Sequence, residues 1–151
     1  MDDQNRREVD AFVRSAAFAE YLLKPREARA KPANVNPKKV SADFVPLAVL
    51  RDDLARKIGA KSTVLRLTEA VAEKMWWRHG PGLIGARDRR RRTVPPEWYA
   101  DIPSILRDIT PQKVGARWRF YSARLKRILV LDLDERGNPV MITYYGRKTA
   151  G

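Results

Sequence analysis

The sequence predicts an α+β fold, with N-terminal helices packed on a small antiparallel β-sheet that the C-terminal half of the chain forms. Two patterns predict this class. Apolar residues recur at helical spacing in three segments before residue 80, whereas an alternation of period two begins at residue 116. The segment 135–138 then separates two strand-like runs in the manner of a β-hairpin turn. Helices therefore come first along the chain and the sheet comes last.

The first 45 residues are predicted to form an arm that is separate from the body of the chain. Apolar side chains in residues 5–23 recur at spacings of three to five, which predicts an amphipathic helix that ends before Pro25. Residues 24–46 contain four prolines and a polar run, as a linker does. Three alternatives remain for this helix: it docks on the body, exchanges with a neighbouring copy, or binds a partner.

The predicted body, residues 46–151, begins with two helices and a short β-rich segment between them. A helix over residues 46–59 is predicted by one apolar face, formed by Leu47, Leu50, Leu54 and Ile58. Residues 62–67 favour a strand. A second helix is predicted over residues 68–78, capped by Thr68 and ended by a Gly-Pro-Gly segment.

A cationic loop, residues 83–96, and a short helical region, residues 97–107, precede the predicted sheet. In the strand 116–122 the even-numbered residues share a packable face, and the opposite face carries Arg117, Arg119 and Tyr121. The apolar run 128–133 is typical of a central strand that is buried on both faces. Residues 140–145 return beside it as the second strand of the hairpin.

The composition excludes several kinds of site. The 151 residues include no cysteine and one histidine, which excludes disulfides, cysteine nucleophiles and thiolate or histidine-rich metal sites. Asp132 and Asp134 share a strand face but have no third acid nearby, so we expect no metal and no cofactor. The acidic start and the absence of a long apolar run predict a cytoplasmic protein without a signal peptide or membrane span.

The net charge of +13 is concentrated in the second half of the chain. Residues 75–127 contain 13 Lys or Arg and 4 Asp or Glu, a net charge of +9. A concentrated positive charge attracts polyanions, and nucleic acid is the most common polyanion in a cell. Solubility, an anionic membrane and an acidic partner protein are alternative explanations of the same charge.

The order of five features resembles the phage-associated branch of the nuclease group named after barnase, EndoU, colicin and RelE. These features are a helix that ends at His79, the segment 102–106, a strand with Tyr121, a strand over 128–132, and a final strand with Thr143. The resemblance covers residues 47–148. It implies helices packed on an antiparallel sheet and metal-independent cleavage of RNA, often as a toxin, by catalytic residues that vary between members.

Cleavage of RNA without a metal needs a base for the ribose 2′-hydroxyl, an acid for the leaving 5′-oxygen, and cations for the phosphoryl oxygens. His79 is the first candidate for acid or base because histidine titrates near neutral pH, and the alternative is a cap at a helix C-terminus. Arg119, Tyr121 and Thr143 complete the predicted catalytic set, through a guanidinium that binds phosphate and two hydroxyls that line the cleft. The alternative for these three is the solvated surface of a strand.

Nine further cations are predicted to hold the nucleic acid by its phosphates, which positions the RNA without reading its sequence. They are Arg87, Arg89, Arg90, Arg91, Arg92, Lys113, Arg117, Arg124 and Lys126. Three tryptophans are candidates for stacking on bases, with burial in the core as the alternative: Trp76, Trp77 and Trp98.

These observations predict a metal-independent endoribonuclease. Its expected partners are RNA, with transfer or ribosomal RNA as candidate targets, and an acidic antitoxin or immunity protein. One alternative is a phage protein that binds nucleic acid or inhibits its host without cleaving RNA. Another is a basic module that docks on an acidic protein. A nuclease loses product but retains RNA affinity when His79 is replaced by alanine, whereas a simple binder never forms product.

Overall fold

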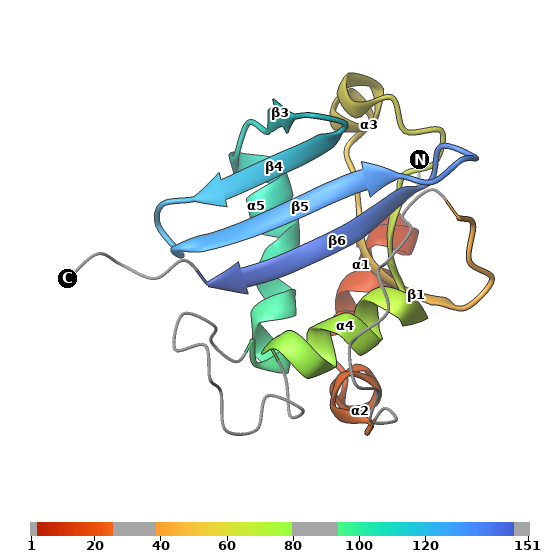
Figure 1. Ribbon diagram of the computed structural model, residues 1–151, viewed down its shortest axis with the longest axis vertical. Helices are drawn as coiled ribbons and strands as arrows, with labels where there is room; N and C mark the ends of the chain where they lie inside the picture. Colours follow the sequence, from red (N-terminus) through yellow and green to blue (C-terminus); the bar gives the residue numbers. More distant parts are fainter. Residues whose placement is uncertain (1–2, 26–38, 80–93, 147–151) are drawn as a thin grey trace.

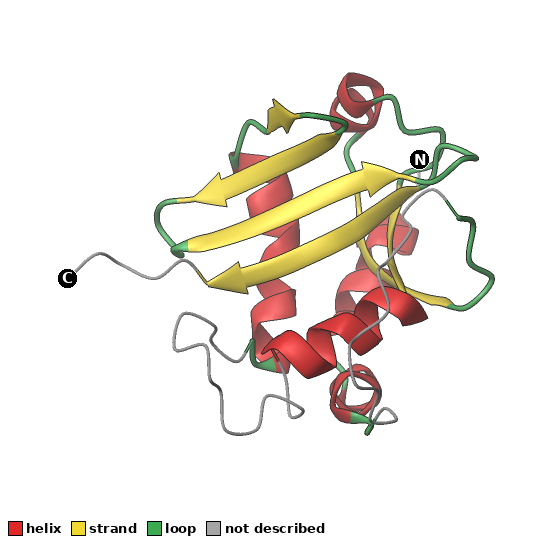
Figure 2. Cartoon of the chain, in the orientation of Figure 1, coloured by secondary structure: helices red, strands yellow, loops and turns green. Residues whose placement is uncertain are grey.

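The helices of this chain pack against a six-stranded, mostly antiparallel sheet, so the predicted α+β class is confirmed (Figures 1 and 2). The computed structural model describes residues 3–25, 39–79 and 94–146, without the side chains of residues 77–79. Its elements are α1 (Asp3–Val13), α2 (Ala16–Leu23), β1 (Phe44–Val49), α3 (Asp52–Ile58), β2 (Val64–Thr68), α4 (Glu69–His79), the 3₁₀ helix η1 (Pro96–Asp101), α5 (Ile102–Asp108), β3 (Gln112–Val114), β4 (Arg117–Ser122), β5 (Arg127–Leu133) and β6 (Pro139–Gly146).

The sheet has the strand order β1-β2-β6-β5-β4-β3. β3 to β6 form an antiparallel meander, in which the predicted hairpin between β5 and β6 is confirmed. β2 joins β6 in parallel through one pair of residues, Arg66 and Val140. The sheet is therefore larger than predicted, because two strands from the first half of the chain extend it beyond the C-terminal meander.

The helix predicted over residues 46–59 is wrong in its first half, where the chain forms β1. The backbone pairs with β2, and Pro46 lies where the register shifts between Pro46 and Ala48, an irregularity of the kind that accommodates proline in a strand. The four consecutive residues 47–50 are all buried. An unbroken buried run of this kind is compatible with a strand as well as with a helix. Only α3 is helical, and it ends at Gly59 as predicted.

The single N-terminal helix that the spacing predicts is two helices, α1 and α2, which meet at Ser15. The Ser15 hydroxyl accepts a hydrogen bond from the Phe18 backbone N–H at 3.3 Å, which caps α2, and donates to the Phe12 carbonyl at 2.6 Å. Val9, Val13 and Phe18 are buried in the same core as the sheet. Of the three alternatives for this arm, the structure shows docking on the body.

The predicted helix over residues 68–78 is confirmed as α4. The Thr68 hydroxyl accepts a hydrogen bond from the Val71 N–H at 3.4 Å, as an N-cap does. Val71 and Met75 are buried, as the spacing predicts. The helical region predicted over residues 97–107 is confirmed as η1 followed by α5.

Helix α5 crosses behind β4, β5 and β6, so one face of these strands is the core face and the other is turned away from the helix (Figure 1). The core face carries Phe120, Leu129, Leu131, Met141 and Tyr144, all fully buried. We call the opposite side of β3 to β6 the outer face. Across the ranges that the structure describes, no helix has both the length and the apolar character needed to cross a membrane.

Candidate nucleic-acid interface

Strand β4 divides its side chains between the two faces of the sheet, as its alternating sequence predicts. Phe120 and Ser122 are buried on the core face. Arg117, Arg119 and Tyr121 alternate with them and therefore lie on the outer face. The structure thus confirms one packable and one cationic face for this strand.

The register of the sheet brings three of the four predicted catalytic residues to the outer face. Arg119 pairs with Val130 on β5, and Val130 pairs with Thr143 on β6, so these residues form one row across three strands. Tyr121 lies in the next row of the same face, opposite Ile128. The Cα atoms of Arg119 and Thr143 are about 10 Å apart, because neighbouring strands are separated by about 4.8 Å.

A pocket of about 350 Å³ opens beside Arg119, where the chain from α5 enters the edge strand β3. Its lining residues are Ile109, Thr110, Gln112, Arg119 and Tyr121. Gln112 pairs with Arg119 across β3 and β4, so its side chain also lies on the outer face. Polar groups from two strands and a loop therefore converge at this point.

Several polar groups of the outer face have no partner among the described residues. Within the described part of the chain, the side chains of Thr110, Gln112, Arg119 and Thr143 make no hydrogen bond or ion pair. A guanidinium without a carboxylate partner keeps its full charge and its fork of donors for an anion. Arg119 is therefore placed to bind a phosphoryl group.

Arg117 differs from Arg119 because an acid lies beside it. The Arg117 Nε atom is 3.9 Å from Asp132 Oδ2, and the Asp132 side chain is only 4% exposed. The negative charge of this carboxylate offsets part of the arginine's attraction for phosphate. Arg117 is consequently the weaker of the two predicted phosphate ligands on β4.

Asp132 and Asp134 both have structural roles. The Asp132 carboxylate accepts a hydrogen bond from the Leu133 N–H at 2.7 Å. Asp134 accepts hydrogen bonds from the N–H groups of Arg136 and Asn138, each at 2.9 Å, and so organises the turn before β6. Burial opposes ionisation of Asp134, yet the hydrogen bonds from Asn138 and Arg136 hold its pKa below the ordinary value.

Three other predicted cations do not join this site. Lys113 projects to the side opposite Arg119, with its Nζ atom 5.7 Å from the centre of the Trp118 ring. Arg124 and Lys126 are exposed in the turn between β4 and β5, beyond the end of the row. They extend the positive surface at one end of the strands but line no part of the pocket.

His79 is the last residue of α4, and its side chain lies outside the described part of the structure, as do Arg87 and the run Arg89–Arg92. The same helix carries Lys74, whose role no pattern in the sequence indicates. Lys74 is 9% exposed, and its ammonium donates to the carbonyl of Ile142, next to Thr143 on β6. β2 pairs with β6 only at Arg66 and Val140, so beyond this point the backbone of β6 is not paired with β2. The Lys74 ammonium provides a hydrogen-bond donor to the backbone of β6 there.

Arg127, a cation of the positively charged segment 75–127, lies in a buried cluster that the sequence pattern does not indicate. Its guanidinium donates to Asp101 Oδ2 at 2.5 Å and to the Tyr144 hydroxyl at 3.0 Å, and it stacks on the Trp98 ring at 4.0 Å. The Tyr144 hydroxyl donates to the Trp98 carbonyl at 2.8 Å. This cluster joins the sheet to η1 on the core face, so the structure gives Trp98 a structural role there.

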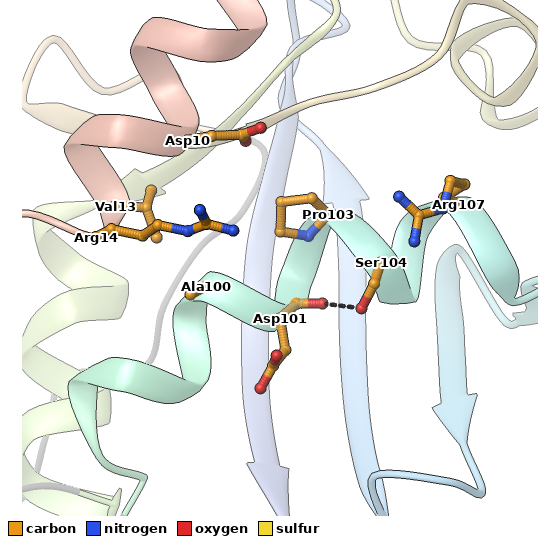
Figure 3. Close-up of a pocket in the computed structure, with 8 residues that line it drawn as sticks. All are labelled: Asp10, Val13, Arg14, Ala100, Asp101, Pro103, Ser104 and Arg107. Atoms are coloured by element: carbon orange, nitrogen blue, oxygen red, sulfur yellow. Dashed lines mark hydrogen bonds between the residues drawn. The ribbon is translucent and has the colours of Figure 1, made fainter.

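A second pocket, of about 270 Å³, lies between α1 and the η1–α5 segment (Figure 3). Acidic and basic residues alternate around it: Asp10, Arg14, Asp101 and Arg107. Asp101 is paired with Arg127, and Arg107 with Asp108 at 3.0 Å. Its two carboxylates offset its two guanidinium groups, and a pocket of mixed charge does not favour a polyanion, so the outer face is the better candidate for binding nucleic acid.

No group of three or more potential metal ligands occurs among the described residues. In comparisons with protein-family models, with curated proteins and with solved structures, the chain shows no significant match.

Proposed function

We propose that this protein is a metal-independent endoribonuclease that binds RNA on the outer face of its sheet. The observation that carries the proposal is the row of Arg119 and Thr143, with Tyr121 beside it, on a face where Arg119 has no partner among the described residues. The net charge of +13 supports it, because a cationic surface attracts RNA over long range.

The proposed reaction is attack of a ribose 2′-oxygen on the adjacent phosphorus. A base removes the 2′-hydroxyl proton, the bond between phosphorus and the 5′-oxygen breaks, and an acid protonates that oxygen. The products are a 2′,3′-cyclic phosphate and a free 5′-hydroxyl. Arg119 stabilises the charge on the phosphoryl oxygens, the hydroxyls of Tyr121 and Thr143 hold the same group, and His79 is the proposed acid or base.

A second candidate is a protein of the same surface that binds nucleic acid without cleaving it. It needs only the phosphate-binding groups of the outer face, Arg119 and Thr143, which have no partner among the described residues. A phosphate-binding surface needs no group that titrates near neutral pH, whereas catalysis does. A basic module that docks on an acidic protein shares the charge but needs no free guanidinium beside a pocket.

The decisive test incubates the purified protein with total RNA and with transfer RNA in EDTA, and resolves the products on a denaturing gel. Discrete fragments are expected from the parent protein, and they should disappear in His79→Ala while RNA affinity remains. Arg119→Ala should lower both cleavage and affinity. Lys113→Ala is the matched control, because it removes one positive charge from the opposite side of the same strands.

The outcomes separate the candidates. RNA that stays intact over a wide range of protein concentration contradicts the enzyme. Salt-dependent retention of that intact RNA then supports the non-catalytic binder, whereas weak, salt-independent retention supports a protein-docking module. We propose a cytoplasmic site of action, a toxin-like role of phage origin, and an acidic antitoxin or immunity protein as the natural inhibitor.

A further inference from the structure

We infer that the pocket beside Arg119 is a subsite for one unpaired adenine base of the RNA, read by the side chain of Gln112. This inference rests on the proposed function, since it names what the outer face recognises on its nucleic acid. The pocket encloses about 350 Å³. Small-ligand sites span about 300–1,000 Å³, so this pocket is of a size that suits a single nucleotide.

No acid lines this pocket, whereas acids line two other pockets of the described residues. Among the described residues, the Thr110 hydroxyl and the Gln112 amide make no hydrogen bond, yet both line the pocket. In the pocket between α1 and α5, Asp101 and Arg107 are held in ion pairs. In a third pocket, the Tyr21 hydroxyl donates to Glu69 at 2.6 Å. The outer-face pocket therefore has polar groups available for a ligand.

The position of Gln112 suits it to read a base. It belongs to strand β3 and is in register with Arg119, so two strands fix the relative positions of these side chains. A carboxamide presents one donor and one acceptor side by side. That arrangement matches the N6 donor and N7 acceptor of adenine, the pairing that Gln and Asn form with this base.

The remaining walls match the other parts of a nucleotide. Tyr121 lies two residues from Arg119 on the same face and offers an aromatic ring on which a base stacks. Arg119 is placed to hold a phosphate next to that base. A base within a duplex is not available to such a pocket, whereas single-stranded RNA presents its bases splayed out. The expected ligand is therefore an unpaired adenosine.

The test measures binding separately from cleavage. Short fluorescent oligouridines with 2′-O-methyl groups lack the attacking hydroxyl, and one version carries a single central adenine. Fluorescence anisotropy at fixed salt gives the affinity of each for the parent protein and for Gln112→Ala, Thr110→Val, Arg119→Ala and Lys113→Ala. Gln112 and Lys113 are neighbours on β3 but lie on opposite faces, so Lys113→Ala is the matched control.

The parent protein is expected to bind the adenine version about tenfold more tightly, since a bidentate pair discriminates by roughly that factor or more. Gln112→Ala should abolish this preference, Thr110→Val should reduce it, and Lys113→Ala should retain it. Equal affinity for both oligonucleotides, or a preference that survives in Gln112→Ala, overturns the inference. If binding still weakens in Arg119→Ala, the proposed function stands. Loss of all Arg119-dependent binding contradicts both.

Discussion

Two arginines of the same strand illustrate how neighbours decide what a residue can do. Arg117 and Arg119 both lie on the outer face of β4. Arg117 is 3.9 Å from the buried carboxylate of Asp132, whereas Arg119 has no acidic partner among the described residues. A guanidinium that already contacts a carboxylate exchanges one anion for another when it binds phosphate, so the net free energy of phosphate binding is smaller. The two positions therefore differ in electrostatic surroundings although the sequence presents them alike.

Replacement of Arg119 by alanine should weaken RNA binding and reduce the dependence of log affinity on log salt by about one. The same replacement at Arg117 should reduce this slope by less, because Asp132 already neutralises part of that charge. Anisotropy titrations of labelled RNA over a series of salt concentrations measure both slopes. Equal slopes for the two variants would contradict the assignment of the phosphate contact to Arg119.

Tyr144 should make the free energy of unfolding depend on pH in the alkaline range. Burial raises the pKa of Tyr144 from 10.0 to about 12, although the hydrogen bond from Arg127 opposes the shift. The folded protein therefore retains the phenolic proton where the unfolded chain has lost it, and the stabilisation is complete below pH 10. The free energy of unfolding should fall as the pH rises from about 10 to about 12.

Urea denaturation at neutral pH and across this alkaline range tests the prediction, with Tyr144→Phe as the comparison. At neutral pH the variant should be less stable by about 1 kcal/mol, because the Trp98 carbonyl and Arg127 lose a partner. In alkali its stability should fall less steeply than that of the parent protein. Parallel curves for the two proteins would exclude Tyr144 as the titrating group.

At the scale of elements, the turn between β5 and β6 requires glycine for two reasons. Gly137 has φ of +84°, and a Cβ added there would lie 2.8 Å from Cγ of Lys61. Gly115, in the turn between β3 and β4, has φ of +62° but open space around it. The two positions share the backbone strain and differ in the steric contact, which makes them a matched pair.

Gly115→Ala should cost about 1 kcal/mol, the usual penalty for a side chain in the left-handed region. Gly137→Ala should cost roughly 1 kcal/mol more, since the Lys61 side chain must also move. Thermal or urea unfolding of both variants gives the comparison. An equal loss of stability at the two sites would show that the contact with Lys61 is relieved at no cost.

The elements that the sequence predicts best are those whose pattern is local. β4 shows alternation in its own residues, and the hairpin of β5 and β6 has its turn residues between two apolar runs. The segment 44–50 is different, because consecutive buried residues fit a strand and a helix equally well. Pairing with β2 decides in favour of the strand, and that partner is remote in sequence.

At the scale of the whole molecule, the N-terminal helices belong to the core rather than to a separate arm. Phe18 is fully buried and meets the ring of Tyr99 edge to face, with centroids 5.4 Å apart. Tyr99 in turn meets Tyr144 at the same separation. A chain of aromatic contacts therefore connects α2 through η1 to the sheet, and the N-terminal helices should unfold together with the rest of the protein.

Phe18→Ala should lower the free energy of unfolding by about 3–4 kcal/mol, because it removes a fully buried ring and leaves a cavity. Leu23→Ala on the same helix is the control, since Leu23 is 48% exposed and should cost little. Urea unfolding followed by circular dichroism measures both. A small effect of Phe18→Ala would show that α2 is dispensable for the fold.

The sequence by itself determined the α+β class, the alternation of β4, the C-terminal hairpin and the concentration of positive charge. The tertiary structure alone decided which residues meet: the row of Arg119 and Thr143, the pocket with Gln112 and Thr110, and the placement of Lys113 on the opposite side. The physical reason is that periodicity reports the local backbone, whereas strand order and register depend on pairing between distant segments. Strand pairing also decides which charged side chains lie beside a partner. Arg119 is the proposed phosphate ligand because it has no partner among the described residues.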